Sequence, residues 1–171
     1  MADNLTIKEL TQEEADAWLK EMYSSAGELL ENLKKAFHAE KTSYPPRALS
    51  QEEREYYMVY ADQDAELLAG INSQSCEISS FSKVVPKSKS KARGRDSVRK
   101  LIEEILVNFC KTKGRGSFSV TTNEDGRRVF DYLKKNLPKG IKEITSPQRT
   151  TCFIPGRSDY YYFILFIADQ T

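Results

Sequence analysis

The chain has 171 residues and a formal net charge of +1 at pH 7, with 39% hydrophobic and 30% charged residues. Nine tyrosines and eight phenylalanines exclude disorder over most of the length, and no apolar run approaches the roughly 20 residues that span a bilayer. We therefore expect one globular domain, residues 1–171, that buries about 70% of its unfolded surface around a single core.

The three cysteines and the single histidine limit the chemistry further. Cys76, Cys110 and Cys152 are odd in number, widely spaced and form no C-x-x-C pair, so we expect reduced, buried thiols in a cytoplasmic protein. The N-terminal residues show no secretory signal. His38 lies among polar, helix-forming residues, so the sequence predicts neither a histidine-based catalytic triad nor a metal site.

The N-terminal third predicts a strand followed by two helices. Apolar and polar residues alternate over residues 5–10, as they do in a strand. Thr11 and Glu14 then form the capping-box pattern that begins a helix. A second helix carries apolar residues on one face over residues 29–37, and it ends before Pro45.

The rest of the chain combines strands with two helices. The predicted strands are 55–61, 66–73, 77–85, 117–121, 141–145 and 160–168, and the predicted helices are 97–111 and 124–136. A short polar turn makes the first two of these strands a hairpin. The order predicts the α/β class, with a mixed central sheet of about seven strands flanked by helices. Strands 77–85 and 117–121 are expected to be parallel.

The most informative stretch is a basic segment at residues 83–100. It contains eight lysines and arginines and one acidic residue, Asp96, and so carries a net charge of +7. It leads into the predicted helix 97–111, whose first backbone N–H groups and dipole also attract anions. The sequence therefore predicts a polyanionic ligand, either a phosphate-bearing cofactor or a nucleic acid.

The order of elements resembles that of the GNAT superfamily of acyl-CoA-dependent N-acyltransferases. The segment RGRDSVRKLI is similar to the superfamily's acyl-CoA loop, R-G-x-G-x-G-x-x-L-L, with Arg93, Gly94, Leu101 and Ile102 on the pattern. The segment NEDGRRVFDYLKK resembles N-x-x-A-x-x-L-Y-E-K, the beginning of a later helix in these enzymes, with Asn123 in place. The resemblance covers nearly the whole chain and implies the GNAT fold.

The chain also departs from the superfamily's pattern. Asp96 and Val98 stand where small residues, mostly glycine, let the pyrophosphate approach the backbone. Phe130 stands where many members carry a tyrosine that protonates the departing CoA thiolate. The acyl-CoA loop is therefore divergent, and the resemblance leaves the proton donor unassigned.

The resemblance implies acetyl-CoA or another acyl-CoA as the co-substrate. Backbone N–H groups of the loop would hold its pyrophosphate, at Arg93, Gly94, Arg95, Asp96, Ser97 and Val98. The N–H groups of Val84 and Val85 would polarise the thioester carbonyl. Glu77 is either the general base or a solvated carboxylate at a strand end, and Asn123 either binds CoA or caps a helix.

The acceptor implied by the resemblance is an amine, on a small molecule or on a protein. Residues 1–55 carry a net charge of −5, which favours a cationic amine but is also ordinary for solvated helix faces. Two other functions stay open. One is a non-catalytic interaction protein with the GNAT fold. The other is a nucleic-acid-binding protein that uses the basic segment, with tRNA as a candidate partner, although no aromatic residue interrupts residues 84–100 to stack on bases. The sequence is consistent with a monomer and with a homodimer.

Overall fold

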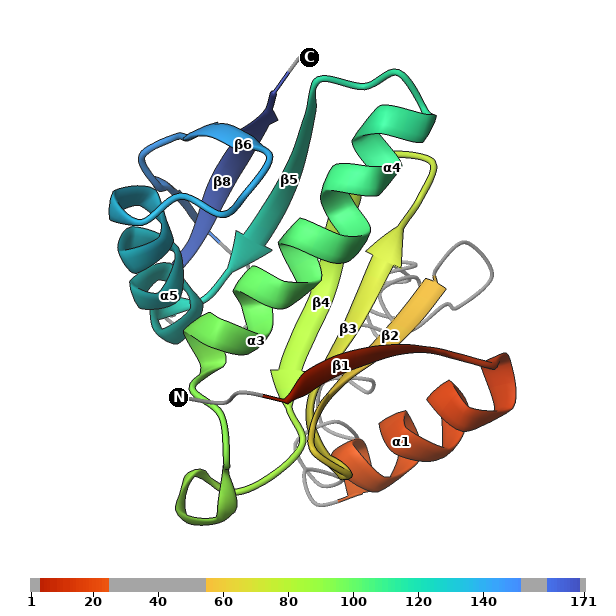
Figure 1. Ribbon diagram of the computed structural model, residues 1–171. Helices are drawn as coiled ribbons and strands as arrows, with labels where there is room; N and C mark the ends of the chain where they lie inside the picture. Colours follow the sequence, from red (N-terminus) through yellow and green to blue (C-terminus); the bar gives the residue numbers. More distant parts are fainter. Residues whose placement is uncertain (1–3, 25–54, 152–159, 170–171) are drawn as a thin grey trace, which may run out of the picture.

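The computed structural model describes residues 4–24, 55–151 and 160–169 (Figure 1). Within these ranges, eight strands form one sheet in the order β1-β2-β3-β4-β5-β8-β6, and β7 also pairs with β8. The strands are β1 (Leu5–Leu10), β2 (Glu55–Ala61), β3 (Asp64–Asn72), β4 (Glu77–Lys83), β5 (Ser117–Thr122), β6 (Ile141–Ile144), β7 (Gln148–Thr151) and β8 (Tyr160–Ala168). The helices are α1 (Gln12–Ser24), α3 (Gly94–Leu101), α4 (Val107–Thr112) and α5 (Glu124–Lys135), with a short 3-10 helix η1 (Lys87–Lys89) and a π-helical turn η2 (Ile102–Leu106).

The predicted α/β class and mixed sheet are confirmed. All paired strands are antiparallel except β4 and β5, which are parallel as the sequence predicted. The sheet of the described residues has eight strands rather than the predicted seven or so. The additional strand is β7, which was not predicted because its sequence, QRTT, has no apolar alternation. The helix predicted at residues 29–37 lies outside the described residues.

The capping box predicted at the beginning of α1 is present. Thr11 Oγ1 accepts a hydrogen bond from Glu14 N at 3.2 Å, and the Glu14 carboxylate accepts one from Thr11 N at 3.1 Å. Lys8 of β1 forms an ion pair with the same carboxylate at 2.9 Å. Glu14 therefore both begins the helix and connects it to the strand that precedes it.

The two faces of β2 and β3 pack against different helices, because successive side chains of these strands point in opposite directions. Val59 and Leu67 belong to the larger core, which includes buried residues of α3, α4 and α5. Met58 and Leu68 point to the other face and pack with Ala15 of α1. Figure 1 shows α3 and α4 running diagonally across the sheet, with α5 beside them.

One continuous helix runs through α3, η2 and α4. It begins at Gly94, three residues before the start of the predicted helix 97–111. The prediction missed this first turn because the turn is polar and carries no apolar periodicity. In η2 the N–H of Val107 donates to the carbonyl of Ile102, five residues back, which makes this turn wider than an α-helical one. In the described ranges, no helix is both long enough and apolar enough to cross a membrane.

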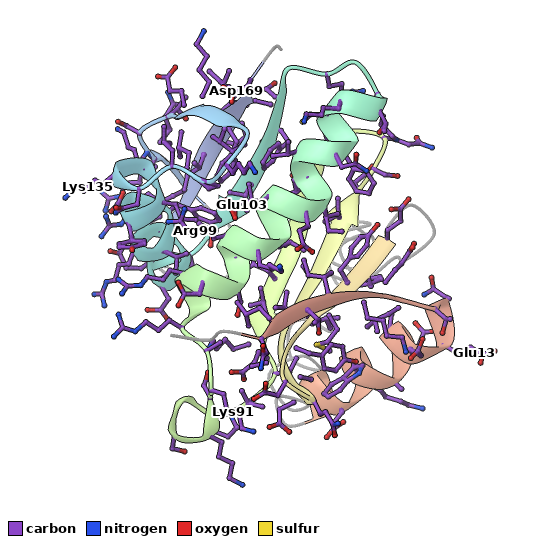
Figure 2. The ribbon with its side chains drawn as sticks, viewed as in Figure 1. Glu13, Lys91, Arg99, Glu103, Lys135 and Asp169 are labelled. Atoms are coloured by element: carbon purple, nitrogen blue, oxygen red, sulfur yellow. The ribbon has the colours of Figure 1, made fainter. Side chains whose placement is uncertain are left out.

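Arg99 and Glu103 fasten this helix to the C-terminal end of α5 (Figure 2). Arg99 donates a hydrogen bond to the carbonyl of Asn136 at 2.8 Å, and Glu103 accepts one from the N–H of Lys139 at 2.6 Å. The arginine thus satisfies a backbone acceptor that the end of α5 leaves without a partner inside the helix. The two helices therefore form one layer over the sheet.

Gly126 provides a test of how closely α5 packs on β5. A Cβ at Gly126 would lie 2.9 Å from the Cβ of Thr122, a buried residue. Gly126→Ala should therefore lower the free energy of unfolding by about 1–3 kcal/mol, despite the higher helix propensity of alanine. Gly94→Ala is the matched control, because Lys83 Cε, the nearest atom to a Cβ there, is 3.7 Å away. Denaturant unfolding checks both variants, and an unchanged midpoint for Gly126→Ala would contradict the packing.

Candidate functional site

The sheet opens between β4 and β5. The two strands pair only at Glu77 with Ser119 and at Ile78 with Val120, although β4 continues to Lys83. Beyond Ile78 the backbone of β4 has no strand partner on this side among the described residues. A wedge therefore separates the C-terminal halves of the two parallel strands.

A β-bulge in β4 lies where the wedge begins. In the pairing with β3, Ile78 lies opposite Ile71 and Ser80 lies opposite Gly70, which leaves Ser79 as the additional residue. A bulge bends its strand and increases the local twist. The extra residue at Ser79 therefore explains why β4 leaves β5 directly after Ile78.

Backbone groups of β4 face this wedge. The N–H of Val84 donates to the carbonyl of Glu66 at 3.1 Å, on the β3 side. Because the N–H groups of an antiparallel strand alternate between its two sides, those of Phe81 and Lys83 point away from β3 and into the wedge. The N–H of Val84, one of the two expected donors to a thioester, is thus already engaged. Val85 lies beyond β4, and its N–H has no hydrogen-bond partner among the described residues.

The first turn of α3 lies beside the end of β4. The N–H groups of Asp96 and Ser97 both donate to the carbonyl of Arg93, at 3.0 and 3.2 Å. Those of Gly94 and Arg95 have no acceptor in the helix, and no side chain caps this helix end in the described part of the chain. Two such donors at the positive end of a helix dipole are groups that attract an anion.

Gly94 leaves room for a ligand at these donors. A Cβ built on Gly94 would meet only Lys83 Cε, at 3.7 Å, among the described residues. Lys89, Lys91 and Arg93 are exposed on the loop that leads to the helix. The room left by Gly94, the backbone donors and the positive charge together fit a phosphate group.

Buried polar atoms without a hydrogen-bond partner also gather around the loop that leads into α3. In the described part of the chain, these atoms are Glu66 Oε2, Arg95 Nε and Ser97 Oγ. The guanidinium of Arg95 lies 4.1 Å above the ring of Tyr132 on α5, and Ser97 is fully buried. Because buried polar groups in proteins are nearly always paired, three such atoms around one loop indicate a place for a ligand or ordered water.

Asp96 and Val98, the two departures from the glycine-rich pattern, differ in their effect on an anion. Asp96 is half-buried in the first turn of α3, and among the described residues it forms no ion pair that would offset its charge. Its carboxylate interacts favourably with the helix dipole but repels a bound phosphate. Val98 is 2% exposed and belongs to the core, so its side chain takes no space from a ligand.

Two other predicted site residues, Asn123 and Glu77, lie outside the first turn of α3. Asn123 caps α5, because its Oδ1 accepts a hydrogen bond from the N–H of Gly126 at 3.0 Å, and capping therefore accounts for this residue without a cofactor. Glu77 is the first residue of β4 and pairs with Ser119, at the closed end of the wedge. About 20 Å of strand separates it from Lys83 at the open end, beside the first turn of α3.

Four phenylalanines connect the two sides of the wedge. Phe130 of α5 contacts Phe81 of β4 and Phe166 of β8 edge to face, with ring centroids 5.7 and 5.2 Å apart, and Phe166 stacks on Phe118 of β5 at 4.7 Å. Phe130 is 1% exposed. This residue therefore serves the core and offers no proton to a departing thiolate.

A charged cluster that the sequence analysis did not identify lies on α5 and β8. Arg127 forms ion pairs with Glu124 and Asp131, and its guanidinium lies 5.4 Å from the ring centroid of Tyr162. Hydrogen bonds from Arg127 and then from Tyr162 lower the pKa of Glu124 to about 2. The helical spacing of the three charged residues is a signal for the part on α5, whereas no local pattern indicates Tyr162.

The cluster predicts how stability depends on pH. The pKa of Glu124 is lower in the folded protein than its ordinary value of 4.5, so its contribution to stability is present above about pH 4.5 and is lost as the pH falls toward 2. Glu124→Gln should therefore lower Tm near neutral pH, and the difference from the wild type should shrink in acid. Glu143→Gln, at an exposed position of β6, is the control and should show no such trend. Thermal unfolding across this pH range checks the prediction, and a constant difference would refute it.

The two described cysteines are buried free thiols, as the sequence predicted. Burial and the neighbouring Cys76 raise the pKa of Cys110 to about 11, which keeps its thiol protonated at neutral pH. Cys152 and His38 lie outside the described residues. In the ranges that the structure covers, no group of three or more His, Cys, Asp or Glu residues is placed to hold a metal ion.

No protein-family model and no curated protein matches the sequence. Solved structures do match the fold. A spermidine N-acetyltransferase from Vibrio cholerae, in complex with CoA and spermine, is 10% identical with a TM-score of 0.55, over 96% of this chain and 95% of that one. The ribosomal-protein-S18-alanine N-acetyltransferase from Escherichia coli is 11% identical with a TM-score of 0.55, over 98% and 97%. With its parted parallel strands and open helix end, the chain therefore has the fold of the GNAT acetyltransferases.

Proposed function

We propose that the chain is an acyl-CoA-dependent N-acyltransferase, with acetyl-CoA as the simplest co-substrate. The observation that carries the proposal is the open first turn of α3 beside the wedge between β4 and β5. An anion site and a gap in the sheet lie together, and the gap exposes backbone donors of β4. This arrangement suits a long ligand with a phosphate group at one end and a reactive carbonyl at the other.

The residues at the first turn of α3 fit the pyrophosphate of CoA. The N–H groups of Gly94 and Arg95 are free to donate, Gly94 leaves space in front of them, and the Ser97 hydroxyl lacks a partner among the described residues. The exposed cations of the loop would neutralise the remaining phosphate charge. Bound acyl-CoA would supply an activated thioester carbonyl.

The backbone N–H groups of Phe81 and Lys83 are better placed than that of Val84 to polarise this carbonyl. They point into the wedge, whereas Val84 N–H donates to Glu66. Donors fixed by the strand need no reorganisation as negative charge develops on the oxygen. Phe130 cannot protonate the thiolate, so the leaving group takes its proton from another group or from water.

The acceptor that we propose is an amine on a small molecule or on a protein. The solved structures with this fold are named for spermidine and for an alanine of a ribosomal protein, and both offer an amine. Exposed carboxylates on α1, such as Glu13 (labelled in Figure 2) and Asp16, favour a cationic acceptor over an anionic one.

A non-catalytic protein of the same fold is the second candidate, and the buried Phe130 favours it. The two candidates differ in turnover rather than in CoA binding. Incubation with acetyl-CoA and a set of polyamines, with release of the CoA thiol as the readout, distinguishes them. A thermal shift with a polynucleotide alone, lost at high salt, would instead assign the basic segment to nucleic acid.

Gly94→Glu should weaken CoA binding by about tenfold or more, because it places a negative side chain where the pyrophosphate is proposed to bind. The fold should be retained, since the nearest atom to a Cβ at this position is 3.7 Å away and a glutamate suits a helix N-terminus. Asn108→Glu adds the same charge at an exposed position of α4 and is the control. Calorimetric titration with CoA measures both, and equal affinities would exclude this cofactor site.

Asp96→Asn should strengthen CoA binding by about two- to fivefold, because it removes a negative charge from the first turn of α3. Asp125→Asn is the matched control, since Asp125 lies in the first turn of α5. The same titration tests both variants. If Asp96→Asn binds CoA more weakly than the wild type, the carboxylate has a binding role and the electrostatic argument fails.

A further inference from the structure

Glu66 is a fully buried carboxylate whose described partners all come from one loop. Its Oε1 accepts hydrogen bonds from the backbone N–H groups of Lys91 and Ala92, both at 2.6 Å, and lies 3.2 Å from the hydroxyl of Ser90. These residues belong to the basic segment directly before α3. A carboxylate loses much hydration when it is buried, and hydrogen bonds to an ionised group are the strong ones that offset this loss.

A second β-bulge positions this side chain. In the pairing of β2 with β3, Val59 lies opposite Leu67 and Tyr60 lies opposite Ala65, so Glu66 is the additional residue. A bulge redirects the side chain that it carries. At an ordinary strand position, the alternation of the pleat alone would set the direction of this carboxylate. Because of the bulge, the backbone of β3 is irregular at Glu66, the residue that holds the loop.

Lys83 holds the same loop from β4. Its ammonium group donates to the Ser90 hydroxyl at 2.5 Å and to the carbonyl of Ala92 at 2.7 Å. Lys83 Cε is also the nearest atom to the space in front of Gly94. Ala92 is thus held through its N–H by β3 and through its carbonyl by β4, two residues before α3 begins.

We propose that Glu66 is a positioning residue that fixes residues 90–92 and thereby sets the first turn of α3 for an anionic ligand. The identity of that ligand as CoA rests on the proposed function. The fixed loop holds the N–H groups of Gly94 and Arg95 in place before the ligand binds. The affinity for the ligand is then higher, because less of the loop must be ordered on binding.

Glu66→Leu separates this role from a contribution to overall stability. Leucine has a similar volume and removes the unpartnered Oε2, but it leaves two loop donors without an acceptor, so Tm should fall moderately while the amides of β3 keep their protection. The N–H groups of Lys91 and Ala92 lose their acceptor and should exchange with solvent faster. The Kd for CoA of Glu66→Leu should rise by about tenfold over that of the wild type. Glu66→Gln keeps a neutral acceptor, so its Kd should lie between those of the wild type and Glu66→Leu.

The control is Asp64→Asn, which removes only the ion pair between Asp64 and the exposed side chain of Lys91 at 2.5 Å. It should leave the Kd within about twofold of the wild type, because exposed ion pairs contribute little. Hydrogen exchange of individual amides, thermal unfolding and calorimetry with CoA are measured on the same proteins.

Three outcomes decide the proposal. It is supported if Glu66→Leu loses amide protection at residues 91–92 and CoA affinity while the protection of β3 is kept. It is overturned if CoA affinity is unchanged, or if affinity falls only together with protection throughout the sheet. A wild-type protein that binds no CoA would remove the proposed function. The exchange rates of the two amides would then still show whether Glu66 holds the loop.

Discussion

The separation of β4 from β5 is the constraint on which the rest of the structure depends. Parallel neighbours normally continue their hydrogen bonds along the whole shared length, and here the ladder stops after two residue pairs. The bulge at Ser79 ends it, and the helix end at Gly94 lies beside the open part. The donors of β4 that face the opening have no strand partner in the described part of the chain, and such donors cost free energy unless water or a ligand satisfies them, so the opening suits an occupant.

The charge around the opening is positive but partly offset. The eight lysines and arginines of the basic segment are opposed by Asp96 in the helix, which brings the net charge of the segment to +7, and by Glu66 beneath the loop. The buried carboxylate accepts from backbone N–H groups of the loop rather than from a lysine or arginine. Lys83 also holds the loop and Lys91 pairs with Asp64, so the exposed side chains of Lys89 and Arg93 are the cations that the described contacts leave available to a ligand.

The features of the fold that depend on local sequence patterns could be predicted from the sequence. The capping box at Thr11, the hairpin, the basic segment and most strand positions follow from periods and short motifs, and the structure has them. The features that build the site depend on strand register, which local pattern does not encode. A bulge adds one residue without changing composition, so neither Ser79 nor Glu66 could be recognised, and Val84 and Glu77 could not be placed relative to the wedge.

The π-helical turn η2 has a consequence for the history of the chain. Buried residues at 98, 102, 106 and 110 recur every four positions, and each such step advances an ideal α-helix about 40° beyond a full turn. A wider turn takes up part of this excess, so that Val98 and Cys110 share one core. An ancestor without one of residues 102–106 would carry a regular helix whose second half is rotated by about 100°. Insertion and deletion at this turn are therefore not neutral, whereas the exposed turn at Gly114 could change length without moving the core.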